Sequence, residues 1–254
     1  MVTSYVSLII NIDFKESILN LVNCQAVKQN STQVKMIIDD NKRVFVIGDL
    51  DANLTKFEAA LTSVNFNPHD DILFSLGDVI DRGNNSVALL KRFRELGVYM
   101  CLGNHEHMLL ESLLANDAAY YNLWVENGGR WHTQVTADEL RFVCKHLLKC
   151  PFSYLVNYKG FEIGLSHTVS KNWDWQAPST NKAHTTAALL WDRDIVKQKL
   201  AIKNKTIDFS VHGHNTTDKP YWLGNSFHID TNYLSGKPTI VELKTLIKDF
   251  KQQH

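Results

Sequence analysis

Three short apolar runs in the first half of the sequence are each followed by a glycine and then by a residue that can bind a metal ion. Their side chains offer carboxylate and amide oxygens together with imidazole nitrogens, a mixture that suits Mn²⁺, Fe or Zn²⁺ better than Ca²⁺. Two such ions, about 3.5–4 Å apart, can polarise a phosphoryl group and lower the pKa of a water between them. The three segments are Gly48-Asp49-Leu50-Asp51, Gly77-Asp78-Val79-Ile80-Asp81-Arg82-Gly83 and Gly103-Asn104-His105-Glu106.

Two later histidines extend this set. His167 follows the apolar run 161–165, and His214 lies in Gly213-His214-Asn215, after the run 207–211. Taken singly, such residues have simpler explanations: an aspartate after a strand usually caps a helix, and a histidine after an apolar run is usually a hydrogen-bonded core residue. The ordered series of glycine-containing segments outweighs those explanations. The sequence therefore predicts a metal centre able to polarise a phosphoryl group.

The elements that must position these residues alternate along the chain. Apolar runs at 44–47, 72–76 and 98–102 predict buried strands, and apolar residues at helical spacing in 54–64 and 87–93 predict helices between them. This β-α-β-α-β order indicates a mostly parallel sheet with right-handed crossovers. In such sheets, ligands bind at the carboxyl ends of the strands, where the candidate residues fall.

The second half is predicted to be helix-rich from 106 to 149 and then strand-rich, with strands at 161–165, 207–211, 227–229 and 239–243. Each of the two later histidines again follows a strand. The same edge of the fold is therefore expected to collect ligands from both halves of the chain.

Composition limits the classes of function. The 254 residues carry no formal net charge, so no global basic field favours nucleic acid or a membrane as a partner. None of the four cysteines forms a C-x-x-C pair, which favours reduced thiols and a cytoplasmic protein. Residues 1–35 are less patterned than the rest, so we expect an N-terminal extension followed by a single catalytic domain over residues 36–254.

The motifs resemble those of the calcineurin-like metallophosphoesterase superfamily. Within it, the chain is similar to the phosphoprotein phosphatase branch, and especially to bacteriophage lambda-type serine/threonine protein phosphatases. The resemblance runs from about Met36 to Leu243 and implies an α/β (α+β) fold, a sandwich of two mixed β-sheets flanked by helices. It also includes three looser matches: Asn127-Gly128-Gly129, Leu190-Trp191-Asp192-Arg193 and Ile229-Asp230-Thr231.

The resemblance implies a role for each candidate residue. His105 would be the general acid that protonates the leaving oxygen after attack by a metal-bridging water, and Asp81 would orient it. Arg82 and Arg193 would bind the phosphate oxygens, since a guanidinium matches two of them at once. His214, directly after a glycine, is favoured over His212. The implied ligands are Asp49 for the first ion, Asp78 for both, and Asn104, His167 and His214 for the second.

The sequence departs from the family pattern at the first metal position. The family reads Gly-Asp-x-His-Gly, whereas this chain reads Gly48-Asp49-Leu50-Asp51-Ala52, and Asn232 stands where a glycine usually follows Asp230-Thr231. In one interpretation Asp51 ligates the metal through oxygen, which leans toward Mn²⁺ or Mg²⁺. In the other, aspartate is too short and the first ion binds weakly. The first interpretation is favoured, which adds Asp51 to the predicted ligands.

These observations predict a phosphomonoesterase with two divalent ions, Mn²⁺ in preference to Fe, Zn²⁺ or Mg²⁺, acting on phosphoserine or phosphothreonine in a protein or on a small phosphoester. One alternative is a diadenosine tetraphosphate or other nucleotide hydrolase. Another is a phosphate-binding or regulatory protein weakened by Asp51. The loop from Thr168 to Lys182 bears on the choice, because Trp173 and Trp175 could stack on a base, line a peptide groove or simply pack inside. The sequence does not predict an oligomeric state.

Overall fold

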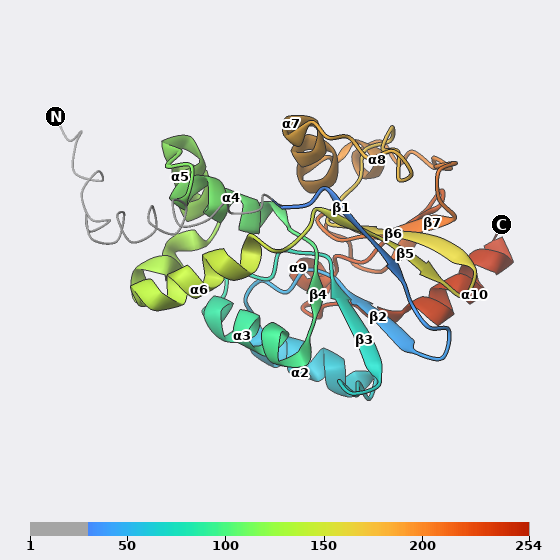
Figure 1. Cartoon of the computed structure of the whole chain (residues 1–254), viewed down its shortest axis with the longest axis horizontal. Helices are drawn as coiled ribbons and strands as arrows, with labels where there is room; N and C mark the ends of the chain where they lie inside the picture. Colours follow the sequence, from blue (N-terminus) through green and yellow to red (C-terminus); the bar gives the residue numbers. More distant parts are fainter. Residues whose placement is uncertain (1–29, 254) are drawn as a thin grey trace.

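The computed structural model describes residues 30–253. Two mixed β-sheets pack face to face, and helices cover the outside, as the resemblance implies (Figure 1). The six-stranded sheet has the order β1-β5-β6-β7-β9-β8, and the four-stranded sheet has the order β10-β2-β3-β4. The strands are β1 Gln33–Ile37, β2 Arg43–Ile47, β3 Asp71–Ser75, β4 Tyr99–Met100, β5 Ser153–Tyr158, β6 Phe161–Ser166, β7 Phe209–His212, β8 Tyr221–Leu223, β9 Ser226–His228 and β10 Ile240–Glu242.

The predicted alternation of strands and helices is confirmed in the smaller sheet. Strand β2 pairs in parallel with β3, and β3 pairs in parallel with β4, while the terminal β10 runs antiparallel to β2. Helix α2 (Leu54–Ser63) and helix α3 (Ser86–Leu96) form the two crossovers. The last strand is shorter than predicted, because the chain turns into helix α10 (Leu243–Gln253) directly after Glu242.

The sandwich follows from the two faces of strand β2. Val44 and Val46 point into a core shared with the six-stranded sheet, whereas Phe45 and Ile47 point into a second core under the helices. All four side chains are almost completely buried. A strand that is apolar on both faces must be covered on both, so helices pack on one side and the second sheet on the other.

The helix-rich stretch predicted between the two halves is also confirmed. Figure 1 shows α4, α5 and α6 gathered at one end of the molecule. Shorter helical turns follow later in the chain. The bounds are α4 Asn104–Leu113, α5 Ala118–Glu126, η1 Gly129–Gln134, α6 Ala137–Leu147, α7 Lys182–Thr186, η2 Ala187–Trp191, α8 Asp194–Lys197 and α9 Asn232–Ser235.

Strand β1 lies across the start predicted for the catalytic domain at residue 36. Strand β1 begins at Gln33 and pairs in parallel with β5, so the last residues of the expected 1–35 extension belong to the larger sheet. The rest of that extension, residues 1–29, lies outside the described residues. Within residues 30–253, no helix has the length and apolar character needed to cross a membrane.

Candidate metal centre and phosphate-binding site

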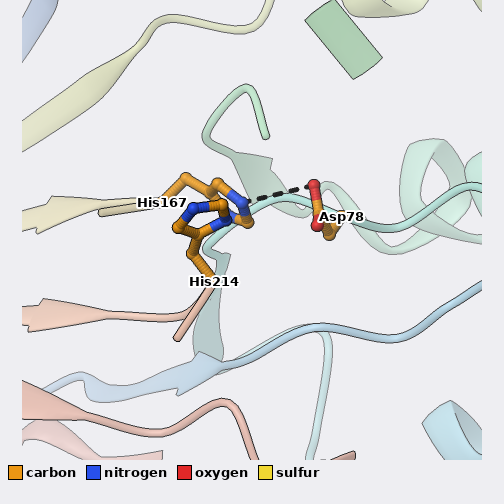
Figure 2. Close-up of side chains that lie close together, drawn as sticks. All are labelled: Asp78, His167 and His214. Atoms are coloured by element: carbon orange, nitrogen blue, oxygen red, sulfur yellow. Dashed lines mark ion pairs between the residues drawn. The ribbon is translucent and has the colours of Figure 1, made fainter. Parts of the chain in front are cut away.

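Loops at the carboxyl ends of the strands bring together Asp78, His167 and His214 (Figure 2). Asp78 follows β3 of the smaller sheet, while the two histidines follow β6 and β7 of the larger one. One ligand atom from each residue lies within 4.8 Å of those of the other two, and all three residues are buried. The site therefore spans the two sheets of the sandwich.

The hydrogen bonds of His167 show that this cluster suits a cation. Its Nδ1 lies 2.9 Å from the carbonyl oxygen of Leu76, which can only accept, so Nδ1 carries the proton. Burial lowers the pKa of His167 and keeps the ring neutral. The lone pair on Nε2 then faces two more acceptors, Asn104 Oδ1 at 2.8 Å and Asp78 Oδ1 at 3.3 Å. Three acceptors that converge in this way need a positive ion between them.

His214 completes the cluster from the other side. Its ring centre lies 4.7 Å from that of His167, and its Nε2 is buried with no hydrogen-bond partner among the described residues. Burial lowers the pKa of His214 to about 2, so the ring is neutral and Nε2 can offer a lone pair to a metal ion. His212 instead contacts serine hydroxyls, with Nε2 2.7 Å from Ser210 Oγ and Nδ1 3.1 Å from Ser166 Oγ.

Carboxylates surround the position proposed for a second ion. Burial raises the pKa of Asp49, and the charges of Asp230, Asp78 and Asp51 raise it further. Burial likewise raises the pKa of Asp230 to about 6. Four acidic groups this close repel one another unless a cation lies among them. These donors suit divalent ions, while the assignment of Asp49 and Asp78 to one ion and of Asp78, Asn104, His167 and His214 to another stays a prediction.

His105 is held in a defined orientation beside this centre. Its Nδ1 lies 2.7 Å from Asp81 Oδ2, and both side chains are buried. Asp81 also accepts hydrogen bonds from the indole nitrogens of Trp124, at 3.0 Å from each oxygen, and Trp131, at 2.6 Å. Burial acts to lower the pKa of His105, but Asp78 and Asp81 outweigh it and raise that pKa. The two tryptophans are functional neighbours that sequence reasoning did not assign.

Two arginines, Arg82 and Arg193, lie next to the cluster. Arg82 donates from Nη1 to Asp51 Oδ1 at 2.6 Å and from Nη2 to His105 Nε2 at 2.8 Å, with 41% of its side chain exposed. Arg193 is exposed and donates to the carbonyl oxygen of His214 at 3.2 Å. Within residues 30–253, Arg193 forms no ion pair with a carboxylate, so its charge remains free to meet an anion.

The predicted ligand Asp51 has other partners. One carboxylate oxygen accepts from Arg82 and the other accepts from Asn232 Nδ2 at 2.7 Å. The ligand cluster described above does not include it. Asp51 as a metal ligand therefore stays a prediction.

The site loops adopt an unusual backbone. Six of the ten non-glycine residues with positive φ in the described part of the chain belong to these loops. Side-chain residues rarely adopt this conformation, and where they do it is often at functional sites. The six are Asp51, Ala52, Asp78, Asp81, Arg82 and His214.

Glu106 explains how the loop after β3 is held, a role that sequence reasoning missed. Its buried carboxylate accepts from the backbone N–H groups of Gly103 (2.9 Å), Asp78 (2.9 Å), Val79 (2.8 Å) and Ile80 (3.2 Å). Burial, with the charge of Asp78, raises the pKa of Glu106 to about 7. The only sequence signal was its place directly after His105.

Replacing Glu106 by alanine is expected to lower the free energy of unfolding by about 3 kcal/mol or more, because several buried N–H groups lose their acceptor. Urea denaturation of the variant would measure this change. Glu126→Ala, at an exposed position on α5, serves as the control and should stay within about 0.5 kcal/mol of the wild type. Equal losses in the two variants would contradict the role given to Glu106.

The structure explains why glycines occur in the Asn127-Gly128-Gly129 segment. A Cβ on Gly128 would lie 2.5 Å from the backbone nitrogen of Arg82, and one on Gly129 would lie 2.5 Å from the indole of Trp124. The Asn127-Gly128-Gly129 segment thus packs directly against Arg82 and against Trp124, the tryptophan that contacts Asp81. Trp173 and Trp175 are almost completely buried, so of the readings considered for them, internal packing is the one observed.

Comparison with known proteins places this site in a family. The model of the calcineurin-like phosphoesterases matches residues 42–242. The chain belongs to the calcineurin-like phosphoesterase family. It is therefore a phosphoesterase of the hydrolase class, and the family implies divalent metal ions, for which Asp78, His167 and His214 form a candidate site.

Individual members of the calcineurin-like phosphoesterase family align over different lengths of this chain. Serine/threonine-protein phosphatase 1 of Salmonella typhimurium is 28% identical over 77% of the chain and 88% of its own length. The symmetrical bis(5'-nucleosyl)-tetraphosphatase of Pectobacterium carotovorum is 41% identical, but over only 26% of the chain and 24% of its own length. A solved protein serine/threonine phosphatase from Saccharomyces cerevisiae shares the fold, with a TM-score of 0.52 at 13% identity, over 87% of this chain and 78% of its own.

Proposed function

We propose that this phosphoesterase is a serine/threonine protein phosphatase that hydrolyses phosphomonoesters. The observation that carries the proposal is the placement of the His105–Asp81 pair and Arg82 directly beside the cluster of converging acceptors at Asp78. A phosphomonoesterase needs positive charge for the phosphoryl oxygens and an acid for the leaving oxygen. The match to Salmonella serine/threonine-protein phosphatase 1 over three quarters of the chain supports the protein substrate.

Each residue has a proposed task in this reaction. Arg82 and Arg193 bind the phosphate oxygens from two sides, and His105 Nε2 gives a proton to the leaving oxygen while Asp81 holds Nδ1. Asn104, His167, His214 and Asp78 would hold one ion, and Asp49 and Asp78 the other. When bound, two divalent ions, which we propose are Mn²⁺, supply positive charge and make water a better nucleophile.

Arg82 links binding to protonation in this proposal. A guanidinium only donates, so His105 Nε2 must accept from Arg82 in the geometry observed and carries no proton there. A phosphate that draws Arg82 toward itself would free Nε2 to hold a proton.

The substrate class is tested by comparing three substrates after metal-stripped protein is reloaded with Mn²⁺. We expect saturable hydrolysis of an aryl phosphate and of a phosphothreonine peptide, with kcat/KM for the peptide at least about tenfold above that for diadenosine tetraphosphate. The reverse order would favour a nucleotide hydrolase. No turnover of any substrate at any Mn²⁺ concentration would favour a phosphate-binding protein.

A nucleotide hydrolase is the second candidate, because a short part of this chain matches the tetraphosphatase of Pectobacterium carotovorum. The burial of Trp173 and Trp175 speaks against it, since neither ring is open for stacking on a base.

We also propose that the protein acts in the cytoplasm, which is supported by the free, buried thiols of Cys101, Cys144 and Cys150. Cys24 lies outside the described residues.

A further inference from the structure

Two of the departures from the family pattern, Asp51 and Asn232, contact each other in space. Asn232, which stands in place of the usual glycine, donates from Nδ2 to Asp51 Oδ2 at 2.7 Å. Asn232 Oδ1 in turn accepts from Lys56 Nζ at 2.8 Å, which fixes the direction of the amide. The two residues lie 181 positions apart in the sequence, so only the fold brings these exceptions together.

The same carboxylate holds the arginine proposed to bind phosphate. Asp51 Oδ1 accepts from Arg82 Nη1 at 2.6 Å, and the other arm of the guanidinium, Nη2, reaches His105 at 2.8 Å. The Asp51 side chain is only 14% exposed, so water competes little for either oxygen. A continuous line of contacts therefore runs from Lys56 through Asn232, Asp51 and Arg82 to His105.

The backbones of the two loops are also locked together. Asp51 and Ala52 donate their N–H groups to the carbonyl oxygens of Asp78 and Val79, at 3.2 and 2.9 Å. A Cβ on Gly83 would lie 2.5 Å from the carbonyl oxygen of Asp51, so the chain after Arg82 passes directly over it. Because the backbone around Arg82 is fixed, the position of the Arg82 guanidinium depends on its contact with Asp51.

We propose that Asp51 and Asn232 form a clamp that positions Arg82 for the substrate phosphate, and that Asp51 does not ligate a metal ion. Both carboxylate oxygens already have partners, one of them in a charge-assisted bond. Turning toward a metal would leave the guanidinium without its carboxylate and Asn232 without its acceptor. This inference rests on the proposed function, because it assigns Arg82 to a phosphate.

Asp51→Asn disrupts the clamp, because it removes the charge that holds Arg82 and places an NH₂ group or a weaker acceptor against Asn232. We expect Mn²⁺ to bind this variant with unchanged stoichiometry and with affinity within about threefold of the wild type, measured calorimetrically without substrate. Inorganic phosphate should bind the Mn²⁺-loaded variant about fivefold more weakly. Removing a nearby negative charge would by itself strengthen phosphate binding, so weaker binding specifically reports lost positioning.

Two more variants make the test specific. Asn232→Ala changes no charge and should weaken phosphate binding about threefold without affecting Mn²⁺. Asp71→Asn is the matched control. It breaks the ion pair between Asp71 and Arg43, which lies at the end of β3 away from the site, and it should leave the binding of Mn²⁺ and of phosphate unchanged. In an Arg82→Ala background, Asp51→Asn should no longer weaken phosphate binding, since the clamp then holds nothing.

Loss of one Mn²⁺ equivalent in Asp51→Asn, or a tenfold loss of affinity for one ion, would overturn the proposal and make Asp51 a ligand. Stronger phosphate binding by that variant would overturn it as well. Thermal unfolding of each variant checks that it is folded. Because both readouts are binding measurements, they remain valid if the wild type hydrolyses none of the three substrates, which would count against the proposed function alone.

Discussion

Asp78→Ala is expected to lower kcat/KM for an aryl phosphate by at least about 10³-fold. The carboxylate lies 3.3 Å from His167 Nε2 and accepts from the backbone N–H of His105 at 3.1 Å. It is also the one group proposed to contact both ions. Without it, the converging lone pairs of His167 and Asn104 lose the negative charge that draws a cation between them.

Equilibrium binding of Mn²⁺ should show the cause of that loss. The variant should bind both ions at least about tenfold more weakly, whereas Asp39→Asn, at an exposed position beyond β1, should behave as the wild type. An Asp78→Ala protein that binds two Mn²⁺ ions with wild-type affinity would show that the metals lie elsewhere.

His105→Asn is expected to lower kcat about 10²–10⁴-fold for a phosphothreonine peptide, the usual contribution of a general acid. The loss should be much smaller for nitrophenyl phosphate, because a nitrophenolate leaves without help from a proton, whereas a threonine alkoxide does not. Mn²⁺ binding should stay within about threefold, because His105 contacts Asp81 and Arg82 and is not part of the ligand cluster.

His69→Asn is the matched control, since His69 is exposed between α2 and β3 and should have no effect on either substrate. Equal losses for the two substrates would contradict a role as general acid and would indicate that His105 only positions the phosphate.

The sequence predicted those parts of the fold and site that depend on local patterns. Buried strands such as β2 and β3 are apolar runs followed by a glycine, and Asp78 after β3 lies in one cluster with His167 and His214. The short helices α7, α8 and α9 were not predicted, because four or five residues carry too little periodicity.

Features that arise from tertiary contacts could not be predicted in this way. The role of Glu106 depends on four backbone N–H groups that meet only when the loop after β3 folds against α4. The partners of Asp51 come from Arg82 and from Asn232 near the other end of the chain. A motif suggests which side chains can act as ligands, but it does not show which of them already have a partner.

The placement of the cluster across both sheets has a consequence for protein abundance in the cell. Its residues come from both halves of the chain; Asp49 and His214, which contact each other, lie 165 positions apart. The site therefore exists only in the native state, and an ion that binds there adds its binding free energy to folding, about 1.4 kcal/mol for each tenfold excess over Kd. Metal starvation would enlarge the unfolded fraction that proteases remove, so the steady-state level of this protein should follow the cellular supply of the ion.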